Sequence, residues 1–235
     1  MQVKRAWKQV DGVLLLDKPI GLTSNDALQK VRRLFSAAKG GHTGTLDPLA
    51  TGLMILLIGK ATSRAADFSG LDKEYRGSMR LGLTTDSWDM DGRILAEAEV
   101  PELTERRLRD VFLSLSGERD VLPPSFSALK QNGVRAYDRA RRGEHVTLEK
   151  RPMRIDAFDL EAFETPEVYF RLSCSKGTYV RSLCQETGQS LGCGAALSSL
   201  VRTRIGSHRL SEALDWDRLK RLSPAQIEVL LRAAE

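Results

Sequence analysis

The residues best suited to chemistry lie in one short stretch, residues 41–52, whose sequence is GHTGTLDPLATG. Asp47 supplies a carboxylate, His42 an imidazole, and three threonines supply hydroxyl groups. Three glycines allow the backbone to adopt positive φ values and to approach a ligand closely. Pro48 disfavours the helical region for Asp47 and favours an extended backbone, which can present the carboxylate outward. The pattern predicts a stiff loop with a reactive carboxylate, although composition alone is also consistent with a simple turn.

Two apolar runs are placed to anchor this loop. Residues 53–58 are all apolar and lie between two glycines, which is typical of a strand buried on both faces. Residues 12–17 form a similar run, followed by a turn that ends in the helix-capping residues Thr23 and Ser24. A polar loop attached to a buried strand can hold a reactive group rigidly.

Other candidate residues lie in or just after predicted strands. Tyr75 belongs to a segment that alternates well enough to form a strand, where a tyrosine is most often a packing residue. Residues 168–174 alternate apolar and polar side chains, which predicts a strand with one buried face. That strand runs into a helix that Thr178 can cap, with Tyr179 and Arg181 in its first turn. Strand ends that open into helices favour ligand contacts, but the spacing fits a surface tyrosine and arginine equally well.

These segments resemble the motifs of the bacterial TruB-type tRNA pseudouridine synthases. GHTGTLDPLATG is similar to the signature of that family, and the resemblance extends from residue 12 to about residue 206. The other similar motifs are KPIGLTS, KEY, TDSWDMDG, PPSFSALK, SKGTYVRSL and LSSLVRTRIG. The resemblance implies an α+β pseudouridine-synthase fold, in which a mixed, mostly antiparallel central sheet is flanked by helices and carries an inserted basic thumb.

The resemblance also assigns roles to individual residues. Asp47 falls at the position of the catalytic aspartate of the family. Tyr75 matches an aromatic residue that stacks on the target nucleobase. It is also a possible general base, which would remove the proton from carbon 5. Tyr179 and Arg181 match active-site residues, and Tyr179 would contact the uracil or help to position it.

Three further assignments depend on the resemblance. His42 is expected to occupy or brace the space that a flipped-out base vacates, and Leu200 to lie under the bound nucleotide. Lys18 and Pro19 are expected to brace the catalytic loop, and Lys18 is also a candidate contact to the loop or to RNA. Without the resemblance, a loop histidine would face solvent and a strand leucine would be core.

The implied reaction converts uridine to pseudouridine, which is an isomerisation and needs no cofactor. The chain carries no GxxxxGK[ST] phosphate loop, and its three histidines lack the spacing of a zinc site, so no metal is expected. Asp47 must be ionised to act as a nucleophile, on either the sugar or the base. Burial alone would raise the pKa of Asp47, and Arg181 is the guanidinium expected to lower it.

The charge of the chain is concentrated in one segment. Residues 130–154 hold eight basic and three acidic side chains, an excess that equals the net charge of +5 of the whole chain. Such a patch favours a polyanion through counterion release, although a solvated basic hairpin has the same composition. The resemblance places a thumb at about 124–152 that closes on the T arm of tRNA. Within this segment, Asn132-Gly133 predicts a turn and residues 136–142 a short basic helix. The candidate RNA contacts are Lys18, Lys130, Arg135, Arg139, Arg141 and Arg142.

The remaining expectations concern the whole chain. We expect one catalytic domain over residues 1–235, with a short helical tail at about 211–235 and no C-terminal PUA domain. The chain shows no signal peptide and no apolar run of membrane length. Its three cysteines are an odd number without a disulfide pattern, which predicts reduced thiols and a cytoplasmic protein. The expected partner is the T arm of tRNA, with no obligate protein partner and a monomeric state.

Three other functions fit parts of the sequence. A non-catalytic RNA-binding protein or tRNA folding chaperone would use the basic segment equally well, but the tyrosines and Arg181 would then be superfluous. A guide-RNA-dependent relative of the archaeal and eukaryotic kind would depend on accessory contacts. A small-molecule hydrolase built on Asp47 lacks a second carboxylate or histidine at a motif position for acid–base work.

Overall fold

The computed structural model describes residues 7–127, 129–131, 134–135, 139, 142, 144, 148–223, 226 and 229–231. The chain divides into two compact units, and the expected single catalytic domain stays a prediction. The first unit comprises Met1–Lys73 and Val201–Glu235, and the second comprises Glu74–Leu200. Among the described residues, no helix is both long enough and apolar enough to span a bilayer.

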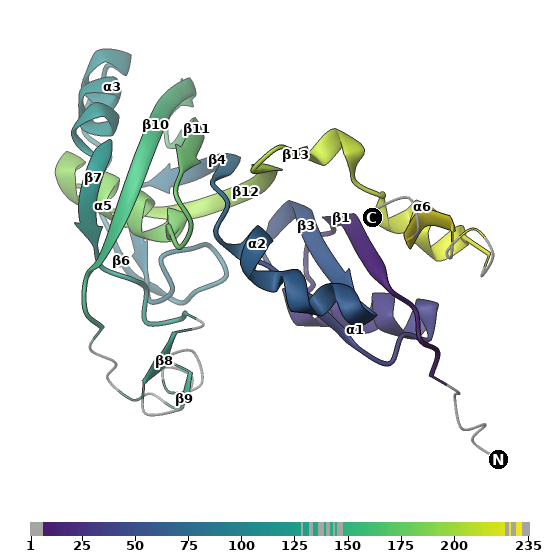
Figure 1. Ribbon diagram of the computed structural model, residues 1–235. Helices are drawn as coiled ribbons and strands as arrows, with labels where there is room; N and C mark the ends of the chain where they lie inside the picture. The colour runs from purple at the N-terminus through teal and green to yellow at the C-terminus, as the bar shows by residue number, and fades with distance from the viewer. Residues whose placement is uncertain are drawn as a thin grey trace. The chain divides into compact units, whose positions relative to one another are not determined.

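The first unit is built on a sheet with the strand order β1-β3-β12 (Figure 1). The short strand β2 pairs with β3, and β13 pairs with β12. β1 runs antiparallel to β3, with Leu15 opposite Ile55. Nearly every residue of β3 is buried, which confirms the prediction of a strand covered on both faces. The strands are β1 (Gly12–Lys18), β2 (Gly40–His42), β3 (Ala50–Ile58), β12 (Ala195–Ile205) and β13 (His208–Arg209).

Short helices pack against this sheet. Thr23 caps α1 through a reciprocal capping box with Asp26, as its position in the sequence predicted. After β3 the chain forms the 3₁₀ helix η1, which continues as α2. The helix expected after Ser223 begins at Pro224, which lies outside the described residues. The helices are α1 (Ser24–Phe35), η1 (Gly59–Arg64), α2 (Ala65–Ser69), η2 (Leu210–Glu212) and α6 (Trp216–Arg221).

Apolar side chains from distant segments form the core of the first unit. The buried cluster draws on β1, β3, α2 and β12, and consists of Val13, Leu53, Ile55, Leu57, Phe68 and Ile205. Burying one such side chain contributes roughly 1.5–3 kcal/mol relative to leaving it in water. The cluster therefore holds β3, and with it the loop that precedes β3, in a fixed position.

The second unit continues with the strand order β12-β4-β11-β10-β7 (Figure 1). β10 pairs antiparallel with both β11 and β7, in agreement with the mostly antiparallel sheet that was expected. In β11, Val168, Phe170, Leu172 and Cys174 are buried, as the period-two pattern predicted. The strands are β4 (Lys73–Leu81), β7 (Gly117–Val121), β10 (Arg151–Glu164) and β11 (Glu167–Cys174).

Two helices of this unit, α3 (Glu105–Ser114) and α5 (Val180–Leu191), contact each other, and α3 also packs on β10. The Thr104 hydroxyl caps α3 by accepting the Arg107 N–H. Phe112 of α3 stacks on Phe158 of β10, with ring centroids 3.8 Å apart. Cys174, Cys184 and Cys193 are buried and free, in agreement with the prediction of reduced thiols.

Two small hairpins complete the second unit. β5 (Leu83–Thr85) pairs with β6 (Ile94–Glu97), and the TDSWDMDG segment forms the turn between them. β8 (Lys130–Gln131) pairs with β9 (Val134–Arg135) in the segment where the thumb was expected. The predicted Asn132-Gly133 turn and most of the predicted helix over 136–142 lie outside the described residues.

Candidate active site

The backbone on both sides of Asp47 is tied to the start of α1. The Ser24 hydroxyl donates to the Leu46 carbonyl oxygen at 3.0 Å and accepts the Leu46 N–H at 2.7 Å. The Gly21 N–H donates to the Pro48 carbonyl oxygen at 2.8 Å. Asp47 itself is half-buried, and its flanking residue Leu46 is buried. The backbone is thus held by hydrogen bonds at Leu46 and Pro48, the two residues that flank the Asp47 carboxylate.

Lys18 lies beneath this loop and is fully buried. Its ammonium donates to the carbonyl oxygens of Pro19 at 2.9 Å and Leu22 at 2.7 Å, so it braces the turn that leads into α1. The pKa of Lys18 is lowered to about 8, mainly by burial; the Asp47 carboxylate opposes this shift and nearby Arg202 contributes to it. These contacts support the expected bracing role. The suggested contact with RNA stays a prediction, and the buried ammonium is bound to two carbonyl groups in this structure.

Arg202 of β12 also lies against the loop, and sequence reasoning missed it. The side chain is 1% exposed, and its Nε and a terminal guanidinium nitrogen donate to Leu53 O at 2.8 Å and Gly44 O at 3.2 Å. A Cβ on Gly52, which has φ +98°, would lie 2.5 Å from the Arg202 carbonyl oxygen. Residues two apart in a strand lie on the same face, so Arg202 lies on the same face as Leu200. That spacing was the signal in the sequence that could have identified Arg202.

His42 ends β2, opposite Leu56 of β3, and is half-buried. It therefore belongs to the same unit as Asp47 and is separated from it by residues 43–46. The neighbouring Thr43 is buried, and its N–H donates to the Ile55 carbonyl oxygen at 3.3 Å. The loop is therefore fastened to β3 at its beginning and to the start of α1 near its middle.

Arg181 organises the corresponding part of the second unit. It lies in the first turn of α5 and is 6% exposed. Its guanidinium donates to Ser87 O at 3.0 Å and to Phe126 O at 2.8 Å. The same side chain lies 3.6 Å from a carboxylate oxygen of Asp89. One buried guanidinium therefore joins α5, the β5–β6 turn and the start of the expected thumb segment.

Asp89 is the second residue that the sequence did not single out. It is buried, and its carboxylate accepts hydrogen bonds from the Ser87 hydroxyl and the Asp91 N–H. The turn is also fastened to β12, because Met90 N–H donates to Leu197 O at 2.9 Å. Three aspartates in this turn looked alike in the sequence, and only the contact with Arg181 distinguishes Asp89.

The other predicted site residues of the second unit have different surroundings. Tyr75 is 7% exposed in β4, and Leu200 is 6% exposed in the middle of β12. Tyr179 is half-buried and is the N-cap residue of α5, without a side-chain capping bond. The prediction that Thr178 caps this helix is wrong, because its hydroxyl donates backward to Ser175 O at 3.0 Å. That bond closes the turn after β11 and leaves Tyr179 at the helix start.

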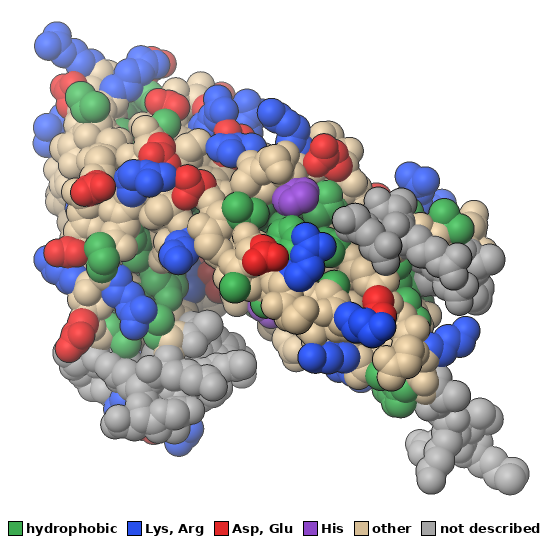
Figure 2. Space-filling model, in the orientation of Figure 1, with side chains coloured by type: hydrophobic (Ala, Val, Ile, Leu, Met, Phe, Trp, Pro, Cys, Tyr) green, Lys and Arg blue, Asp and Glu red, His purple; other side chains and the backbone are tan. Residues whose placement is uncertain are grey.

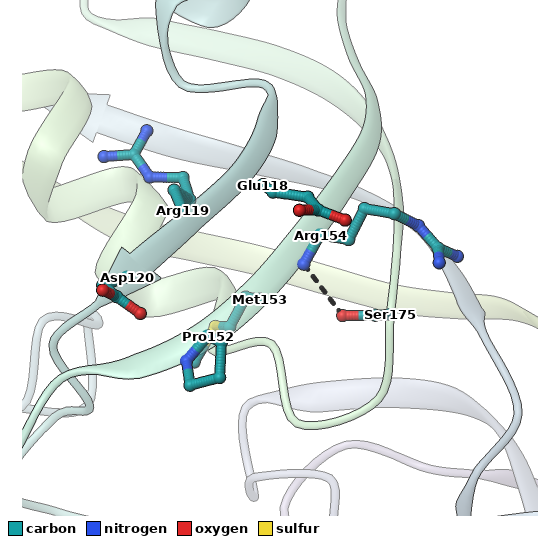
Figure 3. Close-up of a pocket in the computed structure, with 7 residues that line it drawn as sticks. All are labelled: Glu118, Arg119, Asp120, Pro152, Met153, Arg154 and Ser175. Atoms are coloured by element: carbon teal, nitrogen blue, oxygen red, sulfur yellow. Dashed lines mark hydrogen bonds between the residues drawn. The ribbon is translucent and has the colours of Figure 1, made fainter.

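A pocket of about 480 Å³ on the second unit lies elsewhere (Figure 3). None of the predicted catalytic residues lines it. Figure 3 shows that Arg119 and Arg154 point away from each other, so their charges do not converge on one ligand. The lining residues are Glu118, Arg119, Asp120, Pro152, Met153, Arg154 and Ser175, and the Arg154 N–H donates to the Ser175 hydroxyl at 3.0 Å.

The candidate RNA contacts of the thumb are only partly described. Lys130 and Arg135 lie in β8 and β9, and Arg141 lies outside the described residues. Arg139 and Arg142 both pair with Glu144, which holds the pKa of that carboxyl below its usual value. On the face shown in Figure 2, Lys and Arg side chains are spread among Asp and Glu side chains.

The predicted site residues fall into two groups. Lys18, His42 and Asp47 belong to the first unit, and the structure adds Arg202 to them. Tyr75, Tyr179, Arg181 and Leu200 belong to the second unit, together with Asp89. In the described part of the chain, no group of three His, Cys, Asp or Glu side chains is placed to hold a metal ion.

Comparison with known proteins gives these two groups a family context. A family model described as "TruB family pseudouridylate synthase (N terminal domain)" matches residues 32–180. The "tRNA pseudouridine synthase B" of Dechloromonas aromatica is 50% identical over 225 residues, covering 96% of this chain and 75% of that protein. The protein of the same name from Opitutus terrae is 46% identical over 94% of this chain and 92% of its own length.

Solved structures provide a second comparison. A chain in the crystal structure of a Cbf5-Nop10-Gar1 complex shares 25% sequence identity with this one and superposes with a TM-score of 0.69. The match covers 93% of this chain but 61% of the length of that chain. The likeness confirms the pseudouridine-synthase fold that the motifs predicted. This chain belongs to the TruB family of pseudouridylate synthases.

Proposed function

We propose that this protein isomerises uridine 55, in the T loop of tRNA, to pseudouridine. The observation that carries the proposal is the restraint of the loop around Asp47, where Ser24 and Gly21 bind the backbone of both flanking residues. A carboxylate held in this way needs no reorganisation to meet a substrate. The relatives named tRNA pseudouridine synthase B support tRNA as the substrate.

The reaction requires the target nucleotide to leave the base stack, because a paired or stacked base cannot reach a side chain in a pocket. Asp47 then acts as the nucleophile on the sugar or the base. The bond between C1′ and N1 breaks and a bond between C1′ and C5 forms. N1 gains a proton and C5 loses one, so the reaction needs no cofactor.

The remaining residues serve that step. The guanidinium of Arg181 keeps the Asp47 carboxylate ionised, since an adjacent positive charge lowers the pKa of a carboxyl group. Tyr75 stacks on the uracil and Tyr179 positions it, while Leu200 lies under the nucleotide. His42 fills the space that the flipped base leaves. A basic thumb grips the T arm through the phosphate backbone.

The protein works in the cytoplasm as a monomer. Its three buried, free cysteines fit a reducing compartment. A non-catalytic RNA-binding protein or a folding chaperone would bind the same RNA without changing it. Formation of pseudouridine therefore separates the proposed enzyme from these alternatives.

The direct test is to compare wild type with Asp47→Asn on a T-arm stem-loop that carries tritium on carbon 5 of the target uridine. We expect Asp47→Asn to release no tritium, because an amide is not a nucleophile here, while the RNA dissociation constant changes by less than about threefold. Asp67→Asn, on the surface of α2, is the matched control and should react at the wild-type rate. Turnover by Asp47→Asn at near the wild-type rate would refute the assignment.

A further inference from the structure

Arg202 is a buried positive charge that binds backbone carbonyl groups on both sides of Asp47. The side chain is 1% exposed, and moving a guanidinium out of water is costly unless its donors are satisfied. Within the first unit, its donors reach two backbone carbonyl groups, Gly44 O and Leu53 O. These carbonyls belong to residues that enclose the segment carrying Asp47.

The backbone of the loop is shaped to fit this arginine. Gly44 and Gly52 both lie directly against Arg202, the first against its side chain and the second against its backbone. A Cβ on Gly44 would lie 3.3 Å from a guanidinium nitrogen, and a Cβ on Gly52 would lie 2.5 Å from the carbonyl oxygen. Two of the three glycines of the loop are therefore explained by contact with one residue.

We propose that Arg202 is a positioning residue, which sets the span of the catalytic loop by binding Gly44 O and Leu53 O at its two ends. The inference rests on the proposed function for the role of Asp47, and on the geometry alone for the restraint. A planar guanidinium can donate to two carbonyls in fixed directions at once, whereas an ammonium is a single point donor. With one bond lost, the loop can change its span and displace the carboxylate.

The decisive variant is Arg202→Lys, with Arg204→Lys as the matched control. Arg204 lies two residues along the same strand, and its guanidinium donates to Gly206 O at 2.9 Å. In single turnover at saturating T-arm RNA, we expect Arg202→Lys to be about 10- to 100-fold slower than wild type, because a displacement of about 1 Å can cost that much. The RNA dissociation constant should stay within about twofold, and Arg204→Lys should keep the wild-type rate.

A readout independent of activity tests the restraint itself. Hydrogen exchange of the amides of residues 43–49 should become at least about 10-fold faster in free Arg202→Lys, with no change in β10 and β11. Equal exchange and equal rates in Arg202→Lys and Arg204→Lys would overturn the proposal. If wild type forms no pseudouridine, the proposed function fails, and the exchange measurement still decides whether Arg202 restrains the loop.

A second variant keeps the proposal falsifiable if Arg202→Lys does not fold. Gly44→Ala leaves the sequence of β12 unchanged and places a Cβ 3.3 Å from a nitrogen of the Arg202 guanidinium. This crowding disturbs the hydrogen bond between Arg202 and Gly44 O through a change in the loop. We expect a several-fold loss of rate and faster loop exchange. Where both variants fold, the double variant should lose little more than Arg202→Lys alone, because both changes disrupt one contact. Losses that multiply, or a Gly44→Ala loop that exchanges like wild type, would contradict the inference.

Discussion

At the scale of single residues, buried cations that bind backbone carbonyl groups organise the candidate residues of each unit. Arg181 binds two carbonyl oxygens and approaches Asp89, and Arg202 binds two carbonyl oxygens near Asp47. Lys18 does the same in the turn before α1. Each bond joins a charged donor to a neutral acceptor, so it fixes the direction of the main chain as well as the position of the side chain.

Sequence reasoning found some of these residues and missed others for a physical reason. Asp47 and Arg181 stand in motifs whose residue types are rare in combination, so local sequence was sufficient to single them out. Arg202 and Asp89 acquire their meaning only from partners far along the chain, such as Leu53 for Arg202. No periodicity or composition encodes such a contact.

Arg181→Lys tests how much of the site depends on the planar guanidinium. An ammonium cannot reach Ser87 O, Phe126 O and Asp89 together, so we expect turnover to fall by 10-fold or more. The free energy of unfolding should fall by about 2 kcal/mol, because buried hydrogen bonds are lost. Urea unfolding and single-turnover kinetics measure both effects. Arg171→Lys, at an exposed ion pair with Glu74, is the control and should change stability by less than about 0.5 kcal/mol. Wild-type turnover in Arg181→Lys would remove this residue from the proposed mechanism.

At the scale of secondary structure, the loop and the strand that follows it behave as one element. β3 is predictable because an uninterrupted apolar run can only be a buried strand here, and α1 and α3 are predictable because their caps are visible in the sequence. The 3₁₀ start of the helix over 60–69 and the cap of α5 were not predictable. Both depend on hydrogen bonds that form only in the packed chain, such as the bond from the Thr178 hydroxyl to Ser175 O.

Gly52→Ala tests the tight packing of β3 on β12. The residue has φ +98°, and an added Cβ would lie 2.5 Å and 2.8 Å from the backbone O and N of Arg202, so the strands must move apart. We expect the free energy of unfolding to fall by about 3 kcal/mol or more, from backbone strain and overpacking combined. Urea unfolding measures the change. Gly70→Ala is the control, since its φ is −75° and the nearest atom to its Cβ is 3.8 Å away, and it should be neutral or slightly stabilising. Similar stabilities of the two variants would show that Gly52 is not required.

At the scale of the whole molecule, the chain forms two compact units without a linker that the sequence could reveal. The boundaries fall between Lys73 and Glu74 and between Leu200 and Val201, inside the continuous strands β4 and β12. Linkers are recognised by shifts in composition, and a strand that passes from one unit to the next has none. The stability of the first unit therefore depends on its own buried groups, of which Lys18 is the one with a shifted pKa near neutral pH.

Lys18 makes the stability of the protein depend on pH in a definite direction. Burial lowers the pKa of the folded-state ammonium from 10.5 to about 8, so between these values the unfolded chain binds more protons than the folded chain. Stability from this group therefore rises with pH through that window, and the cost of burying the charge is fully present below about pH 8. Relative to Lys18→Met, wild type should gain on the order of 2 kcal/mol in the free energy of unfolding between pH 7 and pH 10. Urea titrations at each pH measure this difference, and Lys60→Met, at a side chain that is 88% exposed, should show no such dependence. A constant difference between wild type and Lys18→Met across the window would mean that the ammonium keeps its ordinary pKa, because the carbonyls of Pro19 and Leu22 then compensate fully for its burial.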